Sequence, residues 1–207
     1  MRSVRRHMVR PAVCFGFIIG LLACAASHPT EAGDPGANST QPPTGITVRP
    51  PYLISVGCVD ISKLTPKNTP TEILLGARDC IDKRDFPRGV HLFALAGVYG
   101  AYDSQRVPDV SAHEIMPAFE QALFGNLDAT ATADFQAAMK EGTGSVQLAQ
   151  MCGEIRKLGP PTYYPTYMTM HGMGAFAGPD PELKPDFAPA AAWESTLASY
   201  LHCPVSG

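Results

Sequence analysis

This chain has few basic residues, no cysteine pair with the spacing of a metal site and no complete catalytic motif. Beyond residue 23, twelve Lys and Arg stand against nineteen Asp and Glu, which gives that part a formal net charge of −7. Nucleic-acid binding needs clustered basic residues, so this balance argues against that class of function. No two cysteines have the C-x2-C or C-x4-C spacing of zinc sites. No phosphate-binding loop, dinucleotide fingerprint or helical-repeat period occurs.

Three short sequences approach catalytic motifs without completing them. His113-Glu114 begins like the zinc motif H-E-x-x-H, but proline stands three residues after Glu114 and the second ligand is absent. Residues 142–145 do not form the G-x-S-x-G nucleophile elbow, and Ser145 is better explained as a helix cap. Residues 171–174 resemble the H-G-x-G sequence of hydrolase oxyanion loops, but this chain has no nucleophile-elbow serine to act with them. We therefore expect neither an enzyme nor a cofactor.

Long hydrophobic runs are also missing. The longest uncharged apolar stretch, Pro11–Ala23, has thirteen residues, too few to cross about 30 Å of hydrocarbon as a helix. Four arginines precede or open this stretch, at positions 2, 5, 6 and 10. A basic segment followed by a short apolar one is typical of a secretory signal. The sequence therefore predicts a signal peptide over residues 1–23.

The end of this segment, Leu21-Leu22-Ala23-Cys24, resembles a bacterial lipobox. The resemblance implies cleavage before Cys24 and acylation of its thiol and its new amino group. Ala23-Cys24-Ala25 also satisfies the A-x-A pattern of an ordinary cleavage site, so that alternative stays open. Residues 25–27 contain no Asp, which by the same resemblance favours the periplasmic face of the outer membrane. Several acyl chains would hold the protein there far more firmly than one.

Residues 24–51 are predicted to be a flexible tether ahead of one folded domain, residues 52–207. Pro, Gly, Ser and Thr dominate the tether, and no apolar periodicity is present. A flexible segment of this length has a mean reach of about 30 Å.

Four cysteines remain after the signal and Cys24 are set aside. In an oxidising compartment an even number predicts two disulfides, and four cysteines allow three connectivities. We favour Cys58–Cys80 and Cys152–Cys203, because each pair joins a helix to a neighbouring terminal segment.

The folded part is predicted to be all-α, an irregular bundle of about six or seven helices. Sustained strict alternation is absent, and apolar residues recur at helical spacing. Small residues on the stripe from Val90 to Ala101 favour close helix packing, and an αα-hairpin is expected at residues 70–101. The helix signals are capping boxes at 69–72 and 111–114, an Ala-rich run at 131–141, a cap at Ser145, and Pro189–His202 with Trp193, Leu197, Tyr200 and Leu201 on one side.

A stretch rich in tyrosine and methionine, residues 162–176, has three interpretations. It is core, or a protein-binding surface, since Tyr and Met are enriched at interface centres. It is also a candidate copper site, because thioether and imidazole groups suit Cu(I). The acidic loop that follows adds two exposed candidates. The candidate interface residues are Tyr163, Tyr164, Tyr167, His171, Asp180 and Glu182, and the candidate metal ligands are Met168, Met170, His171 and Met173.

The complete layout resembles the periplasmic immunity lipoproteins that accompany antibacterial effectors. The resemblance lies in the lipobox, the tether, the paired cysteines and the missing active site. It implies a protein partner, an incoming toxin that is bound stoichiometrically, and a membrane contact through the N-terminal lipid. The alternatives are an accessory or scaffold lipoprotein of envelope assembly, and a periplasmic copper-handling protein.

Overall fold

The computed structural model describes residues 54–176 and 183–204, which all belong to one compact unit. This part of the chain is all-α, as expected, with seven α-helices, three short 3-10 helices and no strand. The predicted signal peptide and tether lie outside the described residues, as do Asp180 and Glu182. The elements are η1 (Ile61–Lys63), α1 (Pro70–Asp82), α2 (Phe86–Arg106), η2 (Val110–Glu114), α3 (Ile115–Phe124), α4 (Ala129–Gly142), α5 (Ser145–Leu158), α6 (Thr166–Thr169), η3 (Met173–Phe176) and α7 (Pro189–Ser199).

Helices α1 and α2 form the expected αα-hairpin. The Thr69 side chain accepts a hydrogen bond from the Glu72 amide, and the Glu72 carboxylate accepts one from the Thr69 amide. This is the predicted capping box, with Pro70 at the first helical position. The Asp85 side chain caps α2 in turn, so only three residues separate the two helices.

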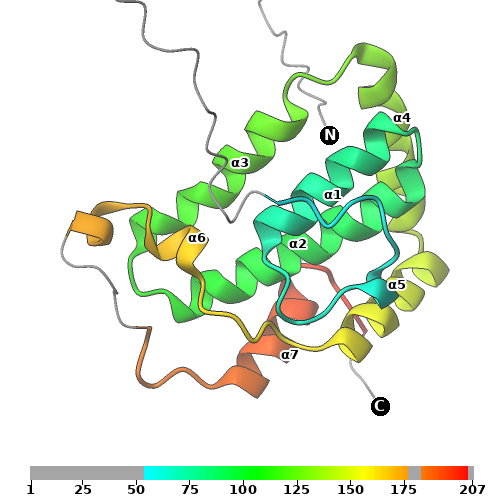
Figure 1. The fold of residues 1–207 in the computed structure, drawn as a ribbon. Coiled ribbons are helices and arrows are strands. Elements are labelled where there is room, and N and C mark those ends of the chain that lie inside the picture. Colours follow the sequence, from blue (N-terminus) through cyan, green and yellow to red (C-terminus); the bar gives the residue numbers. More distant parts are fainter. Residues whose placement is uncertain (1–53, 177–182, 205–207) are drawn as a thin grey trace, which may run out of the picture. The chain divides into compact units, whose positions relative to one another are not determined.

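Helix α2 is the centre of the bundle and packs against α1, α4, α7 and η1 (Figure 1). Its inner residues Leu92, Leu95 and Tyr99 are fully buried. They belong to one hydrophobic core shared by α1, α5, α6 and α7. A smaller cluster joins α2 to α3 and α4 through the rings of Phe93, Phe124 and Phe135. No helix in the described ranges is both long enough and apolar enough to cross a membrane.

Both favoured disulfides are present. Cys58–Cys80 fastens the segment before η1 to α1, and Cys152–Cys203 fastens the residues after α7 to α5. Each bond therefore joins a core helix to chain that has little regular structure of its own.

Three helix boundaries differ from the prediction. Residues 111–114 lie in the 3-10 helix η2, because the Asp109 carboxylate accepts both the backbone N–H and the hydroxyl of Ser111. Gly144, not Ser145, is the cap residue of α5. The last helix ends at Ser199 and not at His202, and Tyr200, which follows it, is 44% exposed. Pro117 stands third in α3, within the first turn, where a missing N–H is tolerated.

Candidate binding cleft

A cleft of about 550 Å³ opens between η1, α2 and α5. Its volume lies within the range of ligand-binding sites, which are about 300–1,000 Å³. Buried or half-buried apolar side chains form part of the lining, and polar side chains from all three elements form the rest. The lining residues are Asp60, Ile61, Ser62, Leu64, Arg88, His91, Gln150, Glu154, Lys157 and Leu158.

Helical spacing explains why these polar residues share one space. Arg88 and His91 are three residues apart on α2, and Gln150 and Glu154 are four apart on α5, so each pair lies on one helix face. Element η1 contacts both α2 and α5, and it brings Asp60 to the same opening. We name this site the η1–α2–α5 cleft.

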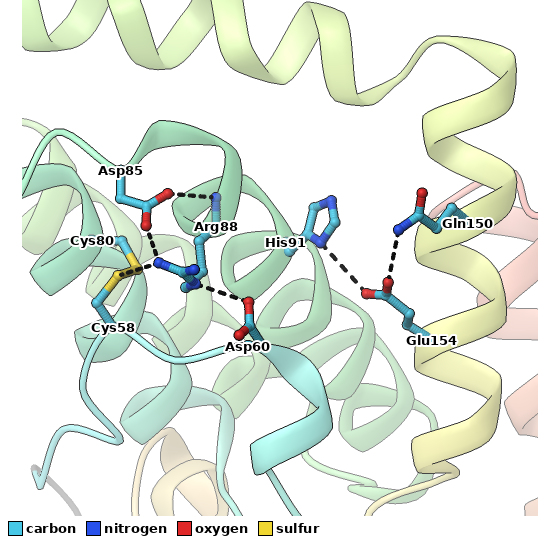
Figure 2. Close-up of polar contacts among 8 residues, drawn as sticks. All are labelled: Cys58, Asp60, Cys80, Asp85, Arg88, His91, Gln150 and Glu154. Carbon is cyan, nitrogen blue, oxygen red and sulfur yellow. Dashed lines mark hydrogen bonds and ion pairs between the residues drawn. A yellow bond between two sulfur atoms is a disulfide. The ribbon is translucent and has the colours of Figure 1, made fainter.

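Arg88 is the most tightly held polar side chain of the cleft. Its Nε donates to Asp60 Oδ1 at 2.9 Å, and its Nη1 donates to Asp85 Oδ2. Nη1 also lies 3.9 Å from Cys58 Sγ, so the guanidinium rests against the disulfide (Figure 2). The hydrogen bond from Arg88 to Asp60, followed by the charge of Asp85, raises the pKa of Arg88. The guanidinium is thus a fixed cation at the mouth of the cleft.

A second polar pair bridges the cleft from α2 to α5. His91 Nδ1 lies 3.6 Å from Glu154 Oε2, and Gln150 Nε2 donates to Glu154 Oε1 at 3.1 Å (Figure 2). The side chain of Glu154 remains 39% exposed and that of Asp60 66% exposed. Lys157 is exposed and forms no ion pair with another described residue. The rim therefore presents charges of both signs to a partner.

The arrangement supplies recognition chemistry. Ile61 and Leu64 are 3% and 8% exposed and give an apolar floor. Around that floor stand a fixed guanidinium, two partly exposed carboxylates and an unpaired ammonium. A partner that fills the floor and matches the rim would form charge-assisted hydrogen bonds, which are stronger than neutral ones.

The candidate interface residues between 163 and 171 differ in their exposure to solvent. Tyr167 is 2% exposed and donates to Asp103 Oδ2 at 2.7 Å, so its assignment to an exposed interface is wrong. Tyr163 is half-buried and donates to the same oxygen at 2.9 Å. His171 is half-buried with Nδ1 2.7 Å from the Tyr167 carbonyl oxygen. Only Tyr164 of the three tyrosines is exposed, at 42%.

Tyr163 and Tyr167 complete an internal ion-pair network. Arg106 donates from Nε to Asp103 Oδ1 at 2.8 Å and from Nη2 to the Tyr163 carbonyl oxygen at 2.9 Å. Burial raises the pKa of the Asp103 carboxyl, while Arg106 and the hydroxyls of Tyr167 and Tyr163 act in the opposite direction. Both tyrosine hydroxyls are thus used to hold the chain after α5 against α2. Of the three interpretations of the tyrosine-rich stretch, core packing therefore fits Tyr163 and Tyr167.

The candidate copper ligands do not share one environment. Met168 is fully buried, whereas Met170 and Met173 are 57% and 74% exposed. Within the described residues, no group of three or more His, Cys, Asp and Glu side chains is arranged to hold a metal ion. Met168 thus belongs to the hydrophobic core, while the thioethers of Met170 and Met173 are exposed to solvent.

The sequence analysis did not identify the η1–α2–α5 cleft. Its residues come from three separate segments, and none of the three carries a motif. The one available signal was polar spacing on otherwise apolar helices, at 88 and 91 and again at 150 and 154. A comparison with known protein-family models, curated proteins and solved structures finds no match for the chain.

Proposed function

We propose that this chain is a lipid-anchored periplasmic binding protein, an immunity protein that neutralises an antibacterial effector by binding it stoichiometrically. The observation that carries the proposal is the η1–α2–α5 cleft, in which Arg88 is held between two carboxylates beside a disulfide. A preformed, braced surface binds with little loss of conformational entropy, which favours tight association.

The N-terminal sequence supports the location. The basic start, the short apolar run and the lipobox-like Leu21-Leu22-Ala23-Cys24 are typical of exported lipoproteins. Acylation of Cys24 would anchor the chain. Residues 25–53 would then separate the anchor from the first described residue. An effector that enters the periplasm would meet the domain close to the membrane.

Charge supports a protein partner with a basic surface. The net charge of −7 beyond residue 23 attracts a cationic protein over several ångströms and raises the rate of encounter. Within the cleft, Asp60 and Glu154 would contact basic groups of the effector, and Lys157 would contact an acidic one. The apolar floor would accept an inserted side chain, which is where binding energy concentrates.

A competition experiment tests the proposed function. A strain that lacks the gene is mixed with its parent, which makes the effector, and survival of the deletion strain is counted after contact. We expect the parent to kill the deletion strain and the restored gene to protect it. Survival equal to that of the parent overturns the immunity function. An envelope defect without sensitivity to the parent would instead favour the scaffold alternative.

A further inference from the structure

A second, smaller pocket of about 250 Å³ lies between α2 and α3, beside the residue that follows α7. On α2 its lining consists of small residues, and on α3 it includes a thioether and a carboxylate. The lining residues are Gly97, Gly100, Ala101, Ser104, His113, Met116, Pro117, Glu120 and Tyr200. At about 100° per residue, positions 97, 100 and 104 face away from Arg88 and His91, so this pocket and the cleft lie on opposite sides of α2.

Two glycines let neighbouring side chains approach the backbone of α2 closely. A side chain at position 97 would place its Cβ 2.1 Å from the Tyr200 hydroxyl, so Gly97 allows the phenol to lie directly on the backbone of α2. At position 100 a Cβ would lie 2.9 Å from Met116 Cγ, so Gly100 admits that thioether in the same way. Tyr200 and Met116 thereby form two apolar walls over bare helix backbone.

Glu120 is the one acidic side chain of this lining. No Lys, Arg or His among residues 54–176 and 183–204 forms an ion pair with it. The carboxylate is half-buried, and burial raises its pKa. Burial also raises the pKa of Tyr200, with the charge of Glu120 as the second cause, which places the two groups in one electrostatic environment.

Partial burial removes solvent from the Glu120 carboxylate, and a bound cation would compensate for that loss. The aromatic face of Tyr200 attracts cations as well, and a polarizable thioether packs well against an alkyl stem. We propose that the α2–α3 pocket binds a primary ammonium or guanidinium group, with Glu120 as the counter-ion and Tyr200 as the aromatic wall. This inference does not rest on the proposed immunity function.

Two sources supply this chemistry, a lysine or arginine side chain of a protein and a free amine. The test uses the full-length chain in a non-ionic detergent and isothermal titration with three probes. These are Nα-acetyl-lysine methylamide, n-butylammonium and the uncharged Nα-acetyl-norleucine methylamide. We expect saturable binding of at least one cationic probe and none of the norleucine probe. Tighter binding of the lysine probe indicates a protein source, and equal binding of n-butylammonium indicates a free amine.

Variants assign the binding to the pocket. Glu120→Gln keeps the shape of the side chain and removes its charge, and we expect it to weaken binding at least tenfold. Tyr200→Leu removes the aromatic face and should weaken binding several-fold. Glu114→Gln, at an exposed carboxylate outside the lining, is the matched control and should bind as the parent does.

A carboxyl NMR signal gives an independent readout. Because a bound cation stabilises the charged form, the pKa of Glu120 should fall when the cationic probe is saturating. His113 and Tyr200 are the other titratable residues of the lining, so the signal is assigned by its loss in Glu120→Gln. The proposal is overturned if neither cationic probe binds saturably, or if Glu120→Gln binds both as well as the parent while retaining its thermal midpoint.

Discussion

Arg88 and Asp60 hold η1 against α2 across 28 positions of sequence. The donor Nε and the acceptor Oδ1 are 2.9 Å apart, and the same guanidinium is paired with Asp85. Element η1 has only three residues and no side-chain cap of its own. This contact and the Cys58–Cys80 disulfide nearby therefore hold η1 at the mouth of the cleft, together with the buried side chain of Ile61.

Loss of the Arg88 guanidinium should loosen η1. In Arg88→Gln we expect several-fold faster hydrogen exchange at the amides of Lys63 and Leu64, which donate to the carbonyls of Asp60 and Ile61. Arg84→Gln removes an arginine whose ion pairs, with Asp128 and Asp134, lie away from η1. Equal exchange at Lys63 and Leu64 in the two variants would contradict the role given to Arg88.

Asp103 should be among the most sensitive polar positions of the core. Its carboxylate accepts from Arg106, Tyr163 and Tyr167, and the Arg106 side chain is 9% exposed. In Asp103→Asn the buried guanidinium loses its counter-charge, and we expect the free energy of unfolding to fall by about 3–5 kcal/mol. Urea denaturation measures the change.

The matched control for this position is Asp186→Asn, at an exposed aspartate. A surface substitution of this kind should alter the free energy of unfolding by no more than about 0.5 kcal/mol. If the two variants lose similar stability, Asp103 does not anchor the tyrosine-rich segment in the manner described.

The Asp109 carboxylate should make the η2–η3 contact dependent on pH. Its Oδ1 accepts from the Ser111 hydroxyl and its Oδ2 from the Gly174 amide, and these bonds, Ser111 first, lower the pKa of Asp109. A carboxyl whose pKa is lowered by folding stabilises the fold above its ordinary pKa and loses that effect as pH falls through the lowered value. Protection of the Gly174 amide should follow this course.

Asp109→Asn checks the assignment at neutral pH. The variant has no carboxylate to titrate, so its Gly174 protection should be weaker and should lack the parent's acid transition. Hydrogen exchange from pH 3 to 7 resolves the two profiles, since the chemical exchange rate can be corrected at each pH. A parent profile parallel to that of the variant would show that another group controls this contact.

The two disulfides should differ in their contribution to stability. Their sequence separations are 22 and 51, and the chain-entropy model assigns about 3 kcal/mol to the shorter loop and about 4 kcal/mol to the longer. Replacing each pair by serines and measuring urea denaturation tests the order. If the variant without Cys58–Cys80 lost more stability than the variant without Cys152–Cys203, the native contacts of η1 would determine the loss, and loop entropy would not.

The sequence predicted the features that depend on local spacing. The Thr69–Glu72 capping box and the α1–α2 hairpin follow from residues close together in the sequence. The count of cysteines predicted two disulfides, and their pairing was favoured because each pair joins a helix to a neighbouring terminal segment. The prediction of Ser145 as a cap was wrong because Ser145 is itself the first residue of α5, which leaves the cap position to Gly144. Tyr167 failed as an interface residue because its partner, Asp103, is 64 positions away and no pattern links them.

The η1–α2–α5 cleft could not be predicted from the sequence either, because its residues are far apart along the chain. Asp60, Arg88 and Glu154 line one cleft because η1 packs against both α2 and α5. Each residue alone has the features of an ordinary solvated side chain. Contacts between residues far apart in the sequence are seen only in the tertiary structure, because the spacing of apolar residues along the chain does not predict them.

The most direct test of the proposed function restores the deleted gene with altered chains and counts survival against the parent strain. Glu154→Lys reverses a charge on the rim of the η1–α2–α5 cleft, and Lys184→Glu reverses an exposed charge outside that lining. With both variants present at parental levels, we expect Lys184→Glu to protect fully and Glu154→Lys to leave the cells sensitive. Full protection by Glu154→Lys would contradict the cleft as the contact site, and survival without any restored gene would contradict immunity itself.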